Sequence, residues 1–282
     1  SPFGPRHRTI RLIRALLALA FASLSLASCG KADDPPVDLL ADNSDAELAA
    51  AAETVIIGTK DGKKIFADHV PVAHARATIV LFHQAGSSAY EYRDIAHRLN
   101  QWGYSTLAVD QRSGGNLFGP NRTVSKYGKS EETYLAALPD LEAALNWARL
   151  QGAPVILLGS SYSAALALRV AADNPKLVAA VMAFSPGEYF PDHHYVHDAA
   201  VRIKVPVFIT QATTSDEQAA SEAIFQAVPD QRKTLFIPHG QGVHGASTLR
   251  ADRNAQGNEE NWQAVRDFLT GLGLPPRYDK LG

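Results

Sequence analysis

A serine lies at the apex of a tight turn between an apolar strand and a helix. Residues 155–158, Val-Ile-Leu-Leu, lead into residues 159–163, Gly-Ser-Ser-Tyr-Ser, and an alanine-rich helical stretch follows. A strand-to-helix turn of this kind exposes a serine hydroxyl for nucleophilic catalysis, and its strain requires small flanking residues. Gly159 and Ser163 meet that requirement around Ser161. The alternative is a plain strand-end turn whose serines only cap the helix.

This turn resembles the nucleophile elbow Gly-x-Ser-x-Gly of the α/β-hydrolase family, with Ser161 in the place of the nucleophile. Ser163 stands where the family pattern has glycine, and a small side chain fits there. The resemblance implies a serine hydrolase whose acid and base follow the nucleophile in that order, each after a strand. It extends over residues 54–272, because further family motifs occur in the family's order, each after a predicted strand.

The loop after the predicted strand 207–210 resembles the acid loop of this family. It reads Gln-Ala-Thr-Thr-Ser-Asp-Glu, and the resemblance implies that Asp216 orients the catalytic base. Glu217 is the alternate acid. The other interpretation of Asp216 is an acidic residue at a helix N-terminus, where the helix dipole favours it.

The base is expected in the glycine-rich loop after the predicted strand 234–237. The family's catalytic histidine lies in such a loop, usually before a small residue, and His244 fits because a glycine follows it. His239 lies too close to the strand end, and a surface histidine is the alternative for each. The implied catalytic triad is therefore Ser161, Asp216 and His244.

Residues 81–87, Leu-Phe-His-Gln-Ala-Gly-Ser, resemble the family's His-Gly-x-Gly oxyanion loop. Gln84 stands where the family has glycine, but an oxyanion hole needs backbone N–H groups more than particular side chains. The resemblance implies the N–H groups of Ala85 and Tyr162 as donors, and the choice between Gln84 and Ala85 stays open. Residues 109–116 resemble the family's Asp-x-Arg-Gly-x-Gly stretch, and we expect them to be structural.

Strand and helix patterns alternate along the chain. Eight strands are predicted over residues 54–57, 64–69, 78–82, 106–110, 155–159, 178–184, 207–210 and 234–237. From the third onward they are continuous apolar runs, typical of parallel strands buried on both faces. The first two have no helix between them and should form an antiparallel lead-in at one edge. The pattern predicts the α/β-hydrolase fold, a mostly parallel, doubly wound sheet of about eight strands with helices on both faces.

Helix boundaries are also readable. Ser88 and Glu91 have the spacing of a capping box, and Gly103 is a candidate for the end of that helix. Further helices are predicted near residues 140–150, from Ser161 to Pro175, and near 216–227 and 259–272.

The first thirty residues have the features of a targeting segment. A basic stretch over residues 6–14 precedes an apolar run over 15–27, which is shorter than the roughly 20 residues that a membrane span needs. The run ends Leu-Ala-Ser-Cys-Gly, which resembles the bacterial lipobox and implies lipidation of Cys29. The alternative is a chance cysteine at the end of an ordinary signal peptide.

We therefore expect three parts: a lipoprotein-type signal peptide over residues 1–28, a lipid anchor and flexible tether over 29–52, and a catalytic domain over 53–282. Cys29 would hold the protein on a membrane of the bacterial cell envelope, with the domain on its periplasmic or outer side. Because the sequence begins with Ser1 rather than Met, further residues are expected to precede it.

Composition excludes several other classes. The net charge is −2 and no basic stripe occurs, so nucleic acid is not an expected partner. Cys29 is the single cysteine, which excludes an internal disulfide and a cysteine-ligated zinc site. The histidines and aspartates of residues 192–198 have metal-like spacing, but the nearby Pro191 favours a solvated loop. We expect no cofactor and no metal.

The predicted activity is hydrolysis of carboxylic esters of small or medium acyl groups through an acyl-serine intermediate. Residues 185–206 connect two strands in about twenty residues, longer than a typical loop but too short for a cap domain, and should hold at most one short helix near 195–203. The substrate would be a small-molecule ester that reaches an open site.

Two other functions stay open: a serine peptidase or amidase of the same fold, and a non-catalytic envelope lipoprotein that uses the fold for binding. A cysteine-dependent dienelactone hydrolase is excluded because the domain has no cysteine, and a haloalkane dehalogenase because that chemistry uses aspartate at the elbow.

Overall fold

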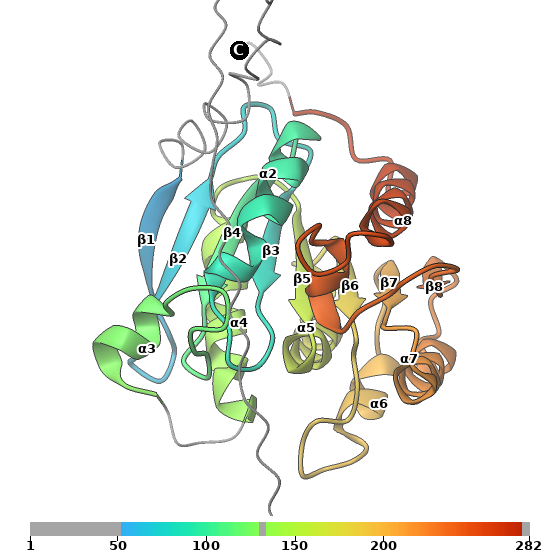
Figure 1. Ribbon diagram of the computed structural model, residues 1–282. Coiled ribbons are helices and arrows are strands. Elements are labelled where there is room, and N and C mark those ends of the chain that lie inside the picture. Colours follow the sequence, from blue (N-terminus) through green and yellow to red (C-terminus); the bar gives the residue numbers. More distant parts are fainter. Residues whose placement is uncertain (1–51, 130–133, 278–282) are drawn as a thin grey trace, which may run out of the picture. The chain divides into compact units, whose positions relative to one another are not determined.

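A computed structural model describes residues 52–129 and 134–277 of the chain, and one eight-stranded sheet organises them (Figure 1). The strands are β1 (Glu53–Gly58), β2 (Lys64–Val70), β3 (Thr78–Phe82), β4 (Ser105–Asp110), β5 (Val155–Ser160), β6 (Ala180–Phe184), β7 (Val207–Thr210) and β8 (Lys233–Phe236). The expected signal peptide, Cys29 and the tether up to residue 51 lie outside the described residues.

The strand order is β1-β2-β4-β3-β5-β6-β7-β8. β1 pairs antiparallel with β2 and β2 antiparallel with β4, whereas every other neighbouring pair is parallel. The predicted mostly parallel sheet with an antiparallel lead-in is thus confirmed. The carboxyl ends of the parallel strands point to the lower edge of Figure 1, so the loops that follow them meet there.

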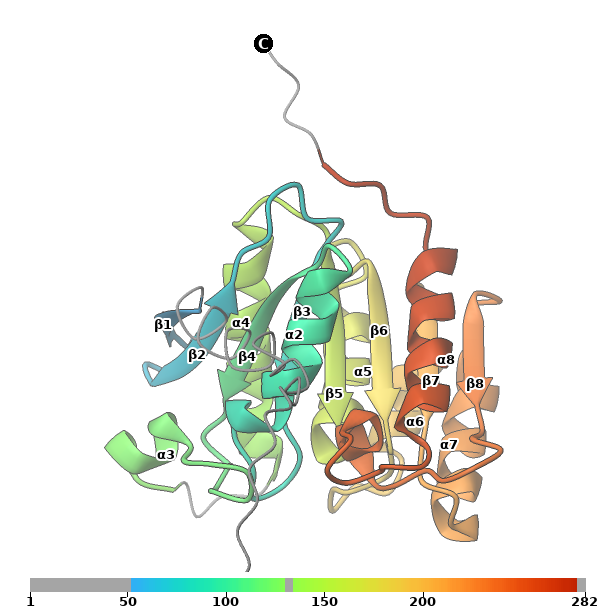
Figure 2. The same ribbon diagram turned by 45° about the horizontal axis from the view of Figure 1, so that its top comes forward.

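Apolar runs form the central strands because both faces of the sheet are covered. All residues of β3, β5, β6 and β7 are buried. Figure 2 shows α2 (Arg93–Gln101) and α8 (Asn258–Gly271) on one face and α4 (Leu138–Arg149) and α5 (Tyr162–Asp173) behind the other. α6 (Tyr195–Ala200) and α7 (Ser215–Ala227) join the second layer, so the core is divided into two clusters, one on each face.

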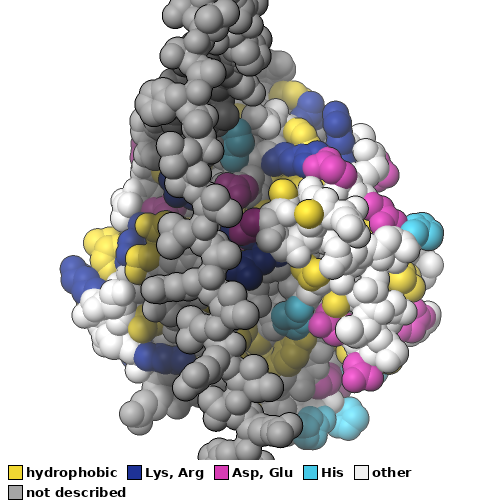
Figure 3. Space-filling view, in the orientation of Figure 1, with side chains coloured by type: hydrophobic (Ala, Val, Ile, Leu, Met, Phe, Trp, Pro, Cys, Tyr) yellow, Lys and Arg dark blue, Asp and Glu magenta, His cyan; other side chains and the backbone are white. Residues whose placement is uncertain are grey.

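The two helices on the first face are linked across their exposed sides. Arg98 of α2 pairs with Glu259 of α8 at 2.7 Å, and its guanidinium lies 4.8 Å from the centre of the Trp262 ring. Figure 3 shows basic and acidic side chains next to one another in this region, with hydrophobic side chains only in small groups. No helix in the described part of the chain is both long and apolar enough to cross a membrane.

The predicted capping box at Ser88 is wrong. A 3-10 helix, η1 (Ala89–Tyr92), precedes α2, and the Ser88 hydroxyl accepts a hydrogen bond from Tyr90 N–H at 3.3 Å. Glu91 does not reach back to the Ser88 backbone, because its carboxyl group is buried against Gln84. The predicted end is confirmed, since Gly103 follows α2 with a φ of +87°.

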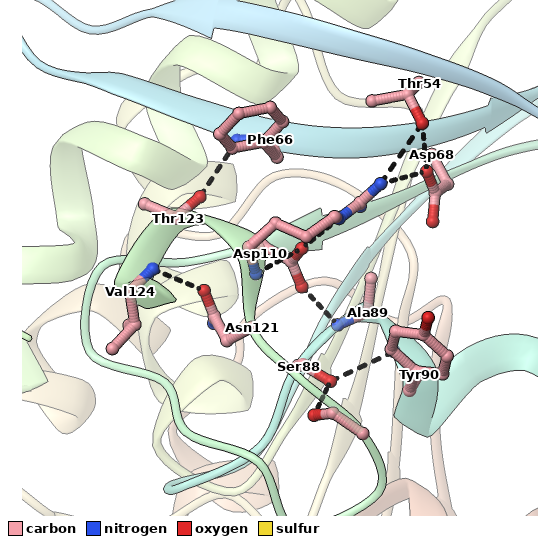
Figure 4. A network of polar contacts seen from close by, with 12 residues as sticks. Thr54, Phe66, Asp68, Ser88, Ala89, Tyr90, Asp110, Asn121, Thr123 and Val124 are labelled. Carbon is pink, nitrogen blue, oxygen red and sulfur yellow. Dashed lines mark hydrogen bonds and ion pairs between the residues drawn. The ribbon is translucent and has the colours of Figure 1, made fainter. Parts of the chain in front are cut away.

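The sequence patterns missed α3 (Arg122–Tyr127), which Asn121 caps by accepting Val124 N–H at 2.9 Å. Buried Asp110 at the end of β4, which is labelled in Figure 4, attaches this helix by accepting the Arg122 Nε–H at 2.7 Å. Arg122 also pairs with Asp68 of β2 at 2.6 Å. The Asp-x-Arg-Gly-like stretch therefore has a structural role at its first residue.

Arg112, in the same stretch, forms a buried ion pair. Its Nη2 lies 2.7 Å from Asp140 Oδ1, and its side chain also contacts Asp61. The Asp140 side chain is fully buried and the Arg112 side chain is 5% exposed. This pair attaches the loop after β4 to the first turn of α4.

We predict that Arg112→Met destabilises the domain by about 3–5 kcal/mol, because Asp140 is left as a buried charge without its partner. Urea denaturation followed by tryptophan fluorescence measures the loss. Arg232→Met is the matched control, since Arg232 pairs with Asp230 at the surface and should contribute at most about 1 kcal/mol. Equal small losses in both variants would contradict this account.

Candidate active site

Ser161 lies between β5 and α5 in a backbone conformation that residues other than glycine rarely adopt, with φ 62° and ψ −126°. Its N–H donates to Phe184 O at 2.8 Å, and the residue is only 6% exposed. Gly159 must be glycine here, because a Cβ would lie 2.4 Å from Ser163 O. The predicted turn is therefore present with its serine at the apex.

Ser163, which replaces the glycine of the elbow pattern, has a bonding role. Its hydroxyl donates to His83 O at 2.6 Å and accepts from Gln111 Nε2 at 2.7 Å. The extra oxygen thus ties the turn to the loops after β3 and β4. A glycine at this position would leave His83 O and Gln111 without that bridge.

The structure brings His244 to Ser161. His244 lies in the loop between β8 and η3 (Gly245–Leu249), and its Nε2 atom is 2.8 Å from Ser161 Oγ. His239 lies elsewhere on the surface, with its ring nitrogen 2.8 Å from Glu260. Of the two histidines in this loop, only His244 is placed to exchange a proton with Ser161.

The acid beside His244 is Glu217 and not Asp216. Glu217 Oε1 lies 2.6 Å from His244 Nδ1, whereas Asp216 is exposed. Both residues lie in the first turn of α7, and consecutive residues of a helix point about 100° apart, so only one can face His244. The expectation for Asp216 is therefore corrected, and the alternate acid takes its place.

Both carboxylate oxygens of Glu217 form hydrogen bonds. Oε2 accepts from Ser185 Oγ at 2.6 Å and from Ala212 N–H at 3.0 Å, while Oε1 faces His244. Burial alone would raise its pKa, but the hydrogen bonds from His244, Ser185 and Ala212 outweigh burial and lower the pKa to about 2. Glu217 is thus ionised at neutral pH, which favours a proton on His244 Nδ1 and leaves Nε2 free to accept the Ser161 proton.

Ser185 connects the acid loop to the histidine loop, and the sequence patterns missed it. Its hydroxyl donates to Glu217 and accepts from Gly245 N–H at 2.8 Å. The residue directly follows β6 and has a φ of +53°. Its place at the carboxyl end of a parallel strand was the one signal available in the sequence.

The oxyanion loop follows β3, whose last residue Phe82 is in register with Gly159 of the elbow. Gln84 N–H donates to Glu91 Oε2 at 2.9 Å, so it is not available to a substrate. The N–H groups of Ala85 and Tyr162 have no acceptor among the described residues. Of the two candidate donors in this loop, the Ala85 N–H is thus the one without an acceptor in the described part of the chain.

His83 shapes this loop as a neutral side chain. Its Nε2 accepts Gln111 N–H at 3.0 Å, and its Nδ1 lies 2.8 Å from Gln84 O. Burial lowers the pKa of His83 to about 4. The His83 ring therefore links the backbone of Gln84 to the backbone of Gln111 through hydrogen bonds.

The connection between β6 and β7 contains one short helix, α6, as predicted. Tyr189 in this segment donates its hydroxyl to Ser185 O at 2.8 Å, and burial raises its pKa to about 12. His194 and His197 are exposed. Across residues 52–129 and 134–277, no group of three or more histidine, cysteine, aspartate or glutamate residues is arranged to hold a metal ion.

Comparison with known proteins agrees with this architecture. Residues 73–194 match the family described as Serine aminopeptidase, S33. A monoglyceride lipase homolog from monkeypox virus is 25% identical over 116 residues, which are 41% of this chain and 40% of that protein. The match thus spans well under half of the relative's length.

Solved structures resemble a larger part of the chain. An esterase from Pyrococcus furiosus has a TM-score of 0.59 and 21% identity, covering 80% of this chain and 92% of that one. A dienelactone hydrolase from Anabaena variabilis has a TM-score of 0.62 and 18% identity, covering 78% and 97%. A monoacylglycerol lipase from Paleococcus ferrophilus has a TM-score of 0.57 and 16% identity, covering 74% and 99%.

The chain therefore has the α/β-hydrolase fold. Its serine, histidine and glutamate have the arrangement found in serine hydrolases built on that fold, where the nucleophile, acid and base occur in this order. Its relatives by sequence and fold include esterases and lipases.

The choice of acid is directly testable. We predict that Glu217→Gln lowers kcat for an ester substrate by about 10³–10⁴-fold, because an amide no longer fixes the proton on His244 Nδ1. Asp216→Asn, the neighbouring control, should stay within about threefold of the unaltered protein, since exposed charges have small effects. Steady-state kinetics measures both. The reverse ranking of the two variants would restore Asp216 as the acid.

Proposed function

We propose that this protein is a serine esterase that hydrolyses carboxylic esters through an acyl-Ser161 intermediate. The observation that carries the proposal is the continuous hydrogen-bond chain from Ser161 Oγ through His244 to Glu217, with distances of 2.8 Å and 2.6 Å. The Tyr162 N–H belongs to the residue directly after Ser161, at the start of α5, and the Ala85 N–H belongs to the loop that follows β3, the strand next to β5. The described residues offer neither N–H group an acceptor, which supports a role of both groups in binding an oxyanion.

The geometry supports a two-step reaction. Ser161 Oγ attacks the ester carbonyl carbon while its proton passes to His244 Nε2, and the carbonyl oxygen becomes an oxyanion held by the two N–H groups. The alkoxide then leaves with the proton from His244, and water repeats the sequence to release the acid. Glu217 stabilises the imidazolium in both steps without taking its proton.

Covalent labelling tests the nucleophile. We predict that a fluorophosphonate probe labels the unaltered protein and that Ser161→Ala removes both labelling and ester turnover with the fold intact. His244→Ala should lower both by several orders of magnitude, on the order of 10³-fold or more. Ser125→Ala, at an exposed serine in α3, is the control and should label normally.

Persistent labelling or turnover in Ser161→Ala would refute the assignment of the nucleophile. A folded protein that takes up no probe at all would favour a non-catalytic binding protein.

We propose that the substrates carry small or medium acyl groups. The segment that connects β6 to β7 contains a single short helix, α6, which packs against α5 and α7, so the segment offers little wall for a long acyl chain. Each CH₂ group that is buried on binding adds only about 0.8 kcal/mol to the binding free energy, and an acyl chain that stays in solvent gains none of this stabilisation.

A series of nitrophenyl esters should therefore show a flat or falling kcat/KM beyond medium acyl lengths, and no rise when the substrate exceeds its solubility. Because two relatives are named for monoglyceride or monoacylglycerol lipolysis, monoacylglycerols belong in the same panel. A steep rise towards long chains would contradict the proposed open site.

Amide or peptide cleavage is the second candidate, since residues 73–194 match a family described as a serine aminopeptidase. The same triad serves both reactions. Aminoacyl nitroanilides assayed beside the esters separate the two, and a higher kcat/KM for the anilides would favour the peptidase.

We further propose that Cys29 carries a lipid that anchors the protein to a bacterial envelope membrane. Two acyl chains suffice for stable anchoring. Cys29→Ser should therefore move the protein from the membrane to the soluble fraction, as measured by fractionation and immunoblotting. Mass spectrometry that finds an unmodified Cys29 in the mature protein would contradict the proposal.

A further inference from the structure

A carboxyl group lies buried behind the oxyanion loop, in a place that the triad does not explain. Glu91, in η1, is fully buried. Its Oε2 accepts Gln84 N–H at 2.9 Å, and its Oε1 lies 3.3 Å from Gln84 Nε2. Burial raises the pKa of this group, so its neutral form is favoured relative to an exposed glutamate.

The position of Glu91 is fixed from both ends of η1. At the start, Ala89 N–H donates to Asp110 at 2.8 Å and the Ser88 hydroxyl donates to Gly119 O at 2.9 Å, as Figure 4 shows around Ser88, Ala89 and Asp110. At the end, Arg250 Nη1 donates to Glu91 O at 2.8 Å. The carboxyl group therefore presents its oxygens from a rigid turn.

Gln84 extends this contact to the histidine loop. Its Nε2 donates to Ser247 Oγ at 3.2 Å, within η3, the helix that begins directly after His244. The packing between these elements is close, because a Cβ on Gly245 would lie 2.4 Å from Ser160 Oγ and 3.9 Å from Gln84 Nε2. The glutamine that departs from the family's oxyanion pattern is thus a link between two catalytic loops.

We propose that Glu91 is a positioning residue for the oxyanion hole: by holding Gln84 N–H, it turns the loop so that Ala85 N–H is presented to the oxyanion. The inference rests on the proposed serine hydrolysis. Consecutive peptide groups in a turn point in different directions. The hydrogen bond that holds the Gln84 N–H against Glu91 therefore also restricts the direction of the following N–H group, that of Ala85. Without the Glu91 carboxyl group as an acceptor, either the Gln84 N–H or the Ala85 N–H could turn towards the oxyanion.

The test compares binding of a ligand that forms an oxyanion with binding of one that does not. An alkyl trifluoromethyl ketone adds Ser161 Oγ to its carbonyl carbon; the carbonyl π electrons become the oxyanion and His244 takes the serine proton. The matching trifluoromethyl carbinol has the same chain but forms no oxyanion. The ratio of the two inhibition constants therefore reports on the hole itself.

Two variants remove or retain the acceptor. In Glu91→Met the volume is nearly filled but no oxygen remains, and we expect kcat and ketone affinity to fall together by on the order of 10- to 100-fold, with carbinol affinity unchanged. In Glu91→Gln an amide oxygen can still accept Gln84 N–H, and both values should stay within about fivefold of the unaltered chain. Ile95→Val, in the buried face of α2, is the control for simple loss of stability and should keep the ratio unchanged.

The inference is overturned if folded Glu91→Met keeps its ketone-to-carbinol ratio, if Glu91→Gln loses as much as Glu91→Met, or if Ile95→Val changes the ratio equally. Absence of ester turnover and of ketone binding in the unaltered chain would overturn the proposed function together with this inference. Turnover and ketone binding in the unaltered chain with an unaffected Glu91→Met would overturn this inference alone.

Discussion

The backbone of Ser161 is the constraint on which the rest of the site depends. A φ of 62° with a ψ of −126° is sparsely populated for a residue with a side chain, and such conformations cost on the order of 1–3 kcal/mol. Contacts with the surrounding sheet offset this conformational cost. Ser161 N–H is bonded to Phe184 O of the neighbouring strand, and Gly159 permits an approach to α5 that any Cβ would block. Because β3, β5 and β6 are parallel and buried, their ends are rigid enough to hold this turn.

Side-chain hydroxyl and carboxyl groups then join the loops to that turn. Ser163 binds the loop after β3, and Ser185 binds both Glu217 and the backbone of the histidine loop. In the proposed inference, Glu91 has the corresponding function for the oxyanion loop. The Ser163 and Ser185 contacts join segments that are 32 to 80 residues apart in the sequence, whereas Glu91 and Gln84 are only seven residues apart, so the site is held by polar bonds of both kinds on top of a conventional apolar sheet.

The sequence predicted the sheet well because strands that are buried on both faces leave a strong local signal. The strands at residues 78–82 and 207–210 agree with their predicted bounds, and the strand that leads into the elbow, predicted over 155–159, spans Val155–Ser160. The acid was predicted wrongly because Asp216 and Glu217 are neighbours in one helical turn, and the rotation of α7 against the sheet decides which of them faces His244.

Glu91 shows why other parts of the site could not be read from the sequence. Its spacing from Ser88 fits a capping box, but its carboxyl group bonds to Gln84, seven residues earlier at the start of the same connection, instead of to the Ser88 backbone. Ser185 likewise gains its partners only through the packing of three loops. A capping-box pattern does not say which backbone N–H a buried carboxyl group will accept, and the partners of Ser185 depend on tertiary packing.

The acyl-enzyme itself provides the most direct measurement of the central claim. The protein is mixed with a nitrophenyl ester, quenched in acid within milliseconds and digested, and the peptides are analysed by mass spectrometry. The account predicts one acyl group on the peptide that contains Ser161, formed with a burst of nitrophenol, and its accumulation should be lost when His244 is replaced by alanine. Turnover with no acylated Ser161, or an acyl group that forms equally well without His244, would contradict it.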